Sequence, residues 1–162
     1  NINSTQADRQ ILEVLRQVGA EVLVEPGEKW DSVTVSHKEL RPFECEATDS
    51  PDLFPALVAL ASGCTGTSRI RGAHRLVYKE SNRIESLQEE FAKMGIRIEV
   101  DDDTMLVTGG VIKGGEVSSR KDHRVAMALA TAALRSSAPV IIAEAEVVSK
   151  SYPTFWSDFL KL

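Results

Sequence analysis

The sequence repeats itself with a period of about 70 residues. The stretch "QVGAEVLV", which begins at Gln17, matches "KMGIRIEV", which begins at Lys93. Further on, "PDLFPALVALASG" from Pro51 matches "DHRVAMALATAAL" from Asp122. In both copies, apolar residues at helical spacing alternate with short stretches typical of strands. The repeat therefore predicts an α/β chain made of two similar units packed against each other.

Each copy has the predicted order helix, two hairpin strands, short strand, helix, strand. We expect one repeat unit over about 1–73, a second over about 74–148, and a C-terminal helix over about 153–162. The predicted helices cover about 11–19, 51–63, 82–95, 122–137 and 153–162, and the predicted strands cover 20–25, 30–36, 43–47, 67–72, 96–100, 104–108, 116–119 and 139–144.

The second predicted helix of the second unit is apolar on nearly all sides, from Val125 to Leu134. A helix of that composition is buried rather than laid on a surface. An α/β protein whose helices are enclosed by sheets would produce this pattern.

Composition excludes several classes of function. The formal net charge of -5 disfavours a general nucleic-acid binder. The sequence has no apolar run of about 18 residues and no signal peptide, so we expect a cytoplasmic protein without a membrane partner. Because the chain opens on Asn1 rather than Met, we expect a piece of a longer or processed protein.

The cysteines and histidines do not suggest a metal site. Cys45 and Cys64 form no CxxC motif, so we expect two reduced thiols. His37, His74 and His123 are scattered without metal-ligand spacing. We therefore expect no metal and no cofactor.

Basic residues stand at two predicted helix starts, where the helix dipole disfavours positive charge. Lys79 and Arg83 flank the start of the helix near residue 82, and Lys121 and Arg124 flank the start of the helix near residue 122. One such case is usually a solvated surface charge. Two suggest an anion shared between helix N-termini, with arginine as a fork for carboxylate or phosphate.

Acidic residues accompany these cations. Asp52 and Asp122 each have a simple alternative explanation, since an acid in the first turn or at the N-cap stabilises a helix. Glu80 is either an exposed surface residue or a general acid or base beside an anion site. Lys150 occupies a further helix entrance. A Ser81–His123–Asp122 triad is rejected, because two members are adjacent and no nucleophile elbow is present.

Four stretches resemble motifs of the 5-enolpyruvylshikimate-3-phosphate synthase family, in the family's order and spacing. They are "PDLFPALVALASGCTGTSRIRG", "RLVYKESNRI", "KDHRVAMALA" and "SKSYPTFW". The family commonly has K-E-[ST]-D-R where this chain has "KESNR", so Asn82 replaces an aspartate. Both residue types cap helices, and we expect little damage from the exchange.

The resemblance implies an inside-out α/β barrel domain of three βαβαββ units, of which this chain has the last two. It also implies a reaction of the shikimate pathway: transfer of the enolpyruvyl group of phosphoenolpyruvate to the 5-hydroxyl of shikimate 3-phosphate, with release of phosphate. That chemistry requires no metal or organic cofactor.

The resemblance also implies a role for each matching residue. Asp52 would contact the hydroxyls of shikimate 3-phosphate and help to remove the 5-hydroxyl proton, and Glu80 would handle the proton of the phosphoenolpyruvate methylene. Lys79 would bind shikimate 3-phosphate, and Arg83 and Arg124 would clamp the phosphoenolpyruvate carboxylate. Two further residues complete the set: Lys150 on the phosphate side and His123 in the pocket wall.

Other parts of the family site are missing from this sequence. The family's Lys-Ser-x-Ser-x-Arg segment, Gly-Asn-Ala-Gly-Thr loop and Ser-Ser-Gln stretch do not occur. The resemblance thus implies that this chain alone is inactive and that its partner is the missing N-terminal part of the same enzyme. Two alternatives stay open: a UDP-N-acetylglucosamine enolpyruvyl transferase, and a non-catalytic α/β repeat module that binds a protein or an anion.

Overall fold

The computed structural model describes residues 5–29, 31–37 and 39–161. The predicted chain ends at Asn1 and Leu162 and the predicted strand start at Trp30 lie outside the described residues. The α/β class is confirmed. The α-helices are α1 (Ile11–Gln17), α2 (Phe54–Ser62), α3 (Arg83–Lys93), α4 (His123–Ala133) and α5 (Phe155–Phe159). The strands are β1 (Glu21–Glu25), β2 (Ser32–Ser36), β3 (Glu44–Glu46), β4 (Gly66–Arg71), β5 (Arg97–Asp101), β6 (Thr104–Gly109), β7 (Gly115–Ser118) and β8 (Val140–Ala143). The 3-10 helices are η1 (Ala7–Gln10), η2 (Pro51–Leu53), η3 (Ala73–Leu76) and η4 (Ala145–Lys150).

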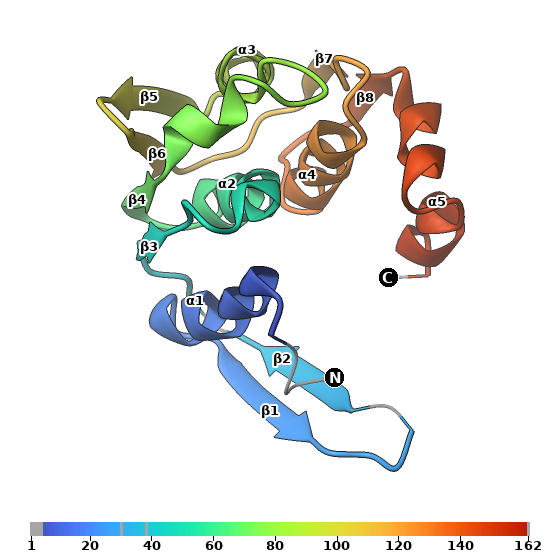
Figure 1. Ribbon diagram of the computed structural model, residues 1–162. Coiled ribbons are helices and arrows are strands. Elements are labelled where there is room, and N and C mark those ends of the chain that lie inside the picture. The colour runs from blue at the N-terminus through green and yellow to red at the C-terminus, as the bar shows by residue number, and fades with distance from the viewer. Residues whose placement is uncertain (1–4, 30, 38, 162) are drawn as a thin grey trace.

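The strands form one four-stranded sheet and two smaller ones (Figure 1). In the large sheet, of order β3-β4-β6-β5, β4 lies parallel to β3 and antiparallel to β6. This four-stranded sheet thus joins two strands from the first half of the chain to two strands from the second half. The hairpin β1-β2 and the parallel pair β7-β8 make the separate two-stranded sheets.

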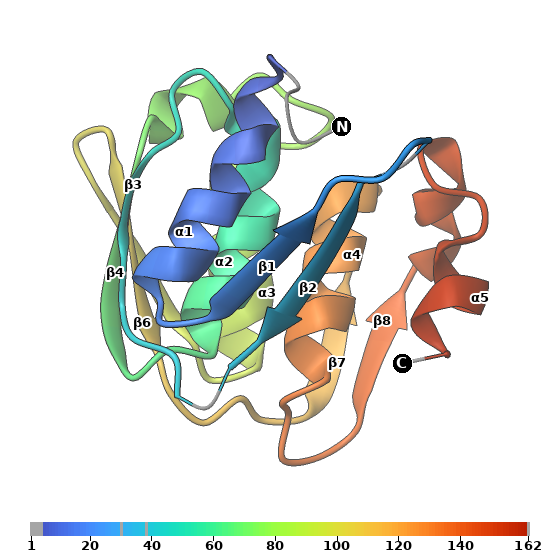
Figure 2. The same cartoon turned by 90° about the horizontal axis from the view of Figure 1, so that it is seen from below.

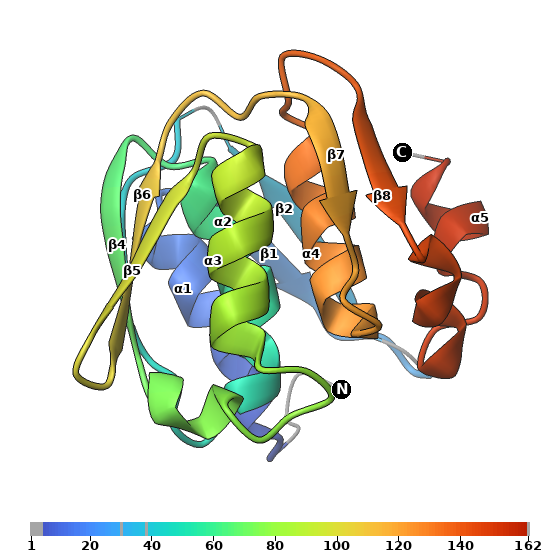
Figure 3. The same cartoon turned by 90° about the horizontal axis from the view of Figure 1, so that it is seen from above.

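Helices α2 and α4 lie in the interior, with strands on opposite sides of them (Figures 2 and 3). Leu57 of α2 and Leu129 of α4 are fully buried. The prediction of a buried helix from Val125 to Leu134 is confirmed for α4, in which the Val125 side chain is also fully buried. It is wrong for Leu134, which lies after the end of α4 and is exposed. Because two apolar helices pack together here, the polar residues at their first turns are held at the edge of a rigid core.

The two halves of the chain repeat the same backbone hydrogen bonds. The Ala47 amide donates to the Arg71 carbonyl at 2.9 Å, and the Ser119 amide donates to the Ala143 carbonyl at 3.1 Å. Both members of the second bond lie 72 positions after their counterparts. This agreement supports dividing the chain into two repeat units, a division that we retain as a proposal.

The same offset relates α3 to α5. Gly72, with φ of 100°, precedes η3, and Glu144, with φ of 56°, precedes η4. Asn82 then stands at the N-cap of α3 and Thr154 at the N-cap of α5. The C-terminal helix therefore occupies the position of a unit's first helix, with Phe155 where α3 has Arg83.

Three predicted boundaries were wrong. The helix predicted from Pro51 opens as the 3-10 helix η2, and α2 begins only at Phe54, because Pro55 has no amide hydrogen for the α-helical bond. The helix predicted to reach residue 137 ends at Ala133, whose carbonyl accepts a bond from the Ser136 hydroxyl. Helix α5 starts two residues after Pro153, and the short helices η3 and η4 were not predicted.

Among the described residues, no helix combines the length and the apolar character needed to cross a membrane.

Candidate active site

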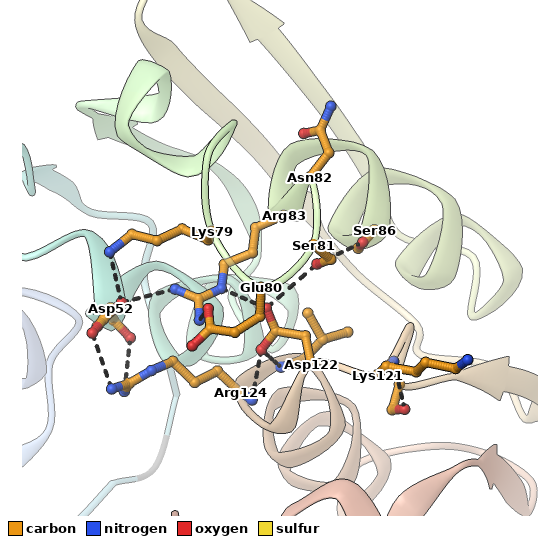
Figure 4. A network of polar contacts seen from close by, with 12 residues as sticks. Asp52, Lys79, Glu80, Ser81, Asn82, Arg83, Ser86, Lys121, Asp122 and Arg124 are labelled. Carbon is orange, nitrogen blue, oxygen red and sulfur yellow. Dashed lines mark hydrogen bonds and ion pairs between the residues drawn. The ribbon is translucent and has the colours of Figure 1, made fainter. Parts of the chain in front are cut away.

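The starts of α2, α3 and α4 meet at one end of the molecule, together with the segment between η3 and α3. Side chains from all of them form a network of ion pairs and hydrogen bonds (Figure 4). Five of the seven residues predicted from the sequence lie in this network: Asp52, Lys79, Glu80, Arg83 and Arg124.

Arg83 is the centre of the network. Its side chain is fully buried, and each of its three nitrogens contacts a carboxylate from a different segment. Nε lies 2.7 Å from Asp122, Nη1 lies 2.8 Å from Asp52, and Nη2 lies 2.5 Å from Glu80. Burial opposes the charged form, but the hydrogen bonds to Asp122 and Asp52 raise the pKa of Arg83 above its ordinary value. The guanidinium is therefore permanently charged and fixed in orientation.

Asp52 receives contacts from three cations. Lys79 Nζ lies 3.2 Å away, Arg83 Nη1 lies 2.8 Å away, and Arg124 Nη2 lies 3.0 Å away. Partial burial alone would raise the pKa of Asp52, but hydrogen bonds from Arg83 and Lys79 and the charge of Arg124 lower it. The side chain is thus ionised at neutral pH and can accept a proton only as a weak base.

Asp122 belongs to the site, although the sequence suggested only a helix cap. It does cap α4, accepting bonds from the amides of Arg124 at 2.9 Å and Val125 at 3.4 Å. Its second oxygen accepts the bond from Arg83 Nε and one from the Ser81 hydroxyl at 3.4 Å. Because this carboxylate is fully buried, it fixes the start of α4 relative to Arg83.

The network is electrically balanced. The three cations Lys79, Arg83 and Arg124 face three carboxylates, which are Asp52, Glu80 and Asp122. The cations at the helix starts are thus stabilised by carboxylates of the protein itself, and binding of an external anion stays a prediction. The Arg124 side chain is 33% exposed, so a ligand carboxylate can reach it by replacing Asp52.

His123 and Lys150 stand outside this network. His123 is 8% exposed, and its Nδ1 is buried without a hydrogen-bond partner among the described residues. Lys150 ends η4 and is exposed, and its ammonium makes no ion pair within the described part of the chain. Lys121 points away toward Glu144, at 3.9 Å. The two helix entrances therefore contribute unequally to the site.

Asn82 performs the capping that its position predicts. Its side-chain oxygen accepts from the amide of Glu85 at 3.5 Å, at the start of α3. The exchange of the family's usual aspartate for Asn82 thus keeps the cap, and Arg83 follows it directly into the network.

The described residues contain no cluster of His, Cys, Asp or Glu side chains that could hold a metal ion. The chemistry available at the site is that of fixed cations and of carboxyl groups held beside them. Such groups bind anions, orient hydroxyls and transfer protons.

Comparison with known proteins identifies the family of this site. The model of the EPSP synthase family (3-phosphoshikimate 1-carboxyvinyltransferase) matches residues 1–159. The chain belongs to the EPSP synthase family. Curated relatives agree: a 3-phosphoshikimate 1-carboxyvinyltransferase of Clostridium acetobutylicum is 42% identical over 163 residues, and one of Clostridium kluyveri is 39% identical over 161 residues.

The chain spans only part of these EPSP synthase relatives. The matches to the Clostridium acetobutylicum and Clostridium kluyveri relatives extend over 100% and 99% of this chain, respectively. They extend over only 37% of the length of each relative. Solved structures give the same picture. An EPSP synthase from Acinetobacter baumannii matches 99% of this chain with 39% of its own, at a TM-score of 0.78 and 29% identity. The enolpyruvyl transferase NikO from Streptomyces tendae matches 97% with 37% of its own, at a TM-score of 0.70 and 26% identity.

Proposed function

We propose that this chain supplies one wall of an active site that transfers the enolpyruvyl group of phosphoenolpyruvate to the 5-hydroxyl of shikimate 3-phosphate. The observation that carries the proposal is the convergence of Arg83 and Arg124 with Asp52 and Glu80 at three helix starts. Family membership supports this reaction, and the side chains that meet at the site are of the types that it requires. The other wall would come from the remaining part of the enzyme, which is the partner that we propose, and the cytoplasm is the location that we propose.

Arg83 and Arg124 are proposed to hold the phosphoenolpyruvate carboxylate, since a guanidinium makes two parallel bonds to a carboxylate. Arg83 is fully buried, so it would reach the ligand through Nη1 after Asp52 has moved away. Arg124 is the more accessible of the two and would exchange Asp52 for the ligand. Lys79, released from Asp52 in the same exchange, would bind shikimate 3-phosphate and orient its hydroxyl. Lys150 is proposed to reach the phosphate of phosphoenolpyruvate, and His123 to support the wall.

In the proposed reaction, the 5-hydroxyl oxygen forms a bond to C2 of phosphoenolpyruvate while Asp52 helps to remove the hydroxyl proton. Glu80 donates a proton to the methylene carbon. Phosphate then leaves C2 and takes up the hydroxyl proton held by Asp52, and Glu80 takes a proton back from the resulting methyl group, which restores the double bond. The balance of protons at Glu80 needs no metal and no redox cofactor.

A phosphate-release assay tests this proposal. The purified chain is given phosphoenolpyruvate and shikimate 3-phosphate, alone and after addition of the N-terminal part of a relative. Because orientation of the reactants supplies roughly 7 to 11 kcal/mol in well-positioned reactions, we expect no turnover from the chain alone and turnover on mixing. Near-native turnover by the chain alone would contradict the one-wall proposal.

The same assay separates the alternatives. Release of phosphate with UDP-N-acetylglucosamine in place of shikimate 3-phosphate would assign the chain to the other enolpyruvyl transferase reaction. Anion binding without turnover in any mixture would favour the non-catalytic module. A matched control is Glu85→Gln, which alters an acid on α3 that lies outside the network.

A further inference from the structure

Glu90 is a buried carboxylate that the proposed reaction does not use. It lies on α3, two turns after Arg83, and its side chain is fully buried. Its oxygens accept bonds from the Ser118 amide at 2.7 Å, from Arg120 Nε at 2.6 Å and from Lys93 Nζ at 2.7 Å. Removing a carboxylate and its cationic partners from water costs free energy, even when they pair with each other. The buried position of Glu90 therefore needs an explanation.

The turn that Glu90 holds is conformationally unusual. Arg120 and Lys121 have φ of 52° and 59°, in the left-handed region that residues other than glycine rarely adopt. Only four non-glycine residues of the described chain have positive φ, and these two are neighbours. Their repeat counterparts, Thr48 and Asp49, are not among the four. The repeated backbone path therefore does not itself demand the left-handed pair.

The left-handed pair is fixed from both sides. The Arg120 amide donates to the Ser118 hydroxyl at 3.1 Å, and the Lys121 amide donates to the Ser119 hydroxyl at 3.1 Å. Glu90 ties this turn to α3 from the buried side: one of its oxygens accepts from the Ser118 amide at the start of the turn, and the other accepts from Arg120 Nε. Glu89 also contacts Arg120, but from the exposed side of the helix.

The turn leads directly into the site. The residue after Lys121 is Asp122, whose carboxylate caps α4 and accepts the bond from Arg83 Nε. A right-handed conformation at Lys121 would change the direction of the chain at Asp122 and so disturb the bond between its carboxylate and Arg83 Nε. Arg124 follows on the first turn of α4 and would move with it.

We propose that Glu90 is a positioning residue of the anion site. It holds the left-handed turn at Arg120 and Lys121, and through this turn it orients Asp122, Arg83 and Arg124. Glu90 touches neither ligand nor reacting atoms. The identity of the anion rests on the proposed function, but the positioning of Arg83 does not.

The competing explanation is that Glu90 merely ties α3 to β7 and stabilises the fold. A glycine substitution distinguishes the positioning role from the purely stabilising role, because glycine adopts positive φ without strain. If Glu90 is needed to hold the turn, Lys121→Gly should restore what Glu90→Gln loses. If Glu90 only stabilises the fold, the glycine should not affect the loss at Arg83.

The experiment compares the full chain with Glu90→Gln, Lys121→Gly, the double variant and Glu89→Gln as the exposed control. Nitrogen-15 NMR follows the Nε–H signal of Arg83, and a phosphoenolpyruvate titration follows affinity. Glu90→Gln should shift or broaden the Arg83 signal and weaken binding about tenfold, since one misplaced left-handed residue costs roughly that factor. The double variant should recover both, and Glu89→Gln should resemble the parent.

An unchanged Arg83 signal in Glu90→Gln would overturn the proposal, as would a loss that Lys121→Gly fails to restore. If Glu90→Gln does not fold, Arg120→Lys serves instead. It keeps the charge and the bond from the Ser118 amide but loses the Nε contact, and it should shift the Arg83 signal in the same direction. Failure of the parent chain to bind phosphoenolpyruvate would count against the proposed function only, because the Arg83 signal still tests the positioning.

Discussion

The starts of α2 and α4 occupy equivalent places in the repeat, yet they use opposite chemistry. Ahead of α2, Ser50 stands at the N-cap of η2 without a capping hydrogen bond, and Asp52 follows in η2. The Ser50 hydroxyl instead accepts from the Gln10 side chain. At α4, Asp122 caps the helix with its carboxylate, and Arg124 follows in the first turn. The two helix starts therefore differ in their capping, in their charged side chains and in the turn that precedes them.

Because the residues at the two equivalent positions carry opposite charges, their side chains can contact each other. At the offset of 72 positions given by the backbone hydrogen bonds, one more than in the sequence match from Pro51, Asp52 and Arg124 are repeat counterparts. Their side chains form an ion pair at 3.0 Å between the two proposed units. Identical residues at both places would repel, since like charges at this distance are unfavourable. The site therefore depends on the two proposed units carrying different residues at equivalent positions, and four measurements test this dependence.

The largest effect is expected from the two cap residues. Asp122→Ala should lower the free energy of unfolding by about 3–5 kcal/mol, because it leaves the buried Arg83 without its Nε partner. Ser50→Ala should cost about 1 kcal/mol, the value of an ordinary hydrogen bond. Urea denaturation of both variants measures the difference. Equal losses would show that the two helix starts are built alike after all.

A smaller effect concerns ligand binding by the enzyme assembled from this chain and its complementing part. Arg124→Lys should weaken phosphoenolpyruvate by about 1.5–3 kcal/mol, because an ammonium cannot make the paired contact to a carboxylate. Shikimate 3-phosphate should be affected less. Binding titrations with each substrate provide the measurement, and equal weakening of both would contradict the role proposed for Arg124.

The contact between the units can be measured by a double-mutant cycle. Asp52→Asn and Arg124→Gln, singly and together, should give a coupling energy of at most about 1 kcal/mol, since both side chains are partly exposed. Thermal or urea unfolding supplies the four free energies. The control cycle uses Arg97 and Glu99, an exposed pair within one strand, and should give less. A zero coupling for Asp52 and Arg124 would remove the electrostatic part of the comparison.

The smallest effect is a dependence on pH. The pKa of Asp52 is lowered in the folded chain, so its contribution is present above its unfolded pKa, which is near 4 for aspartate, and is lost as pH falls through the folded value. The gap in stability between the parent and Asp52→Asn should therefore be constant from about pH 5 to 7 and shrink below about pH 4. Urea unfolding at a series of pH values measures this gap. A gap that widens on acidification would reverse the sign of the shift.

Much of the candidate site could be predicted, because several of its residues conflict with their immediate sequence surroundings. Arg83 and Arg124 conflict with the helix dipole, and a conflict at two helix starts is visible in the sequence alone. The family motifs then gave the remaining residues. The sequence could not predict that protein carboxylates balance these cations, because the partners of Arg83 lie up to 39 residues away.

The missed features have similar causes. Glu90 reads as one more charge in an acidic helix, but it lies on the same buried side as Leu87 and Phe91, and that spacing is the signal that could have revealed it. Helix α2 began late because Pro55 removes an amide that a periodicity pattern does not test. The left-handed pair at Arg120 and Lys121 has no glycine to mark it, so its sequence gives no warning.

The shared sheet has a consequence for how the chain is made. Six residue pairs join β4 to β6, and one of these, Thr67 with Thr108, spans 41 positions. During synthesis, β4 leaves the ribosome long before β6 exists, so its open edge must wait for its neighbour. Such non-local pairing slows folding and leaves an exposed edge to which other chains can add. The segment between β4 and β6 therefore sets the interval in which a nascent copy of this protein is most exposed to aggregation.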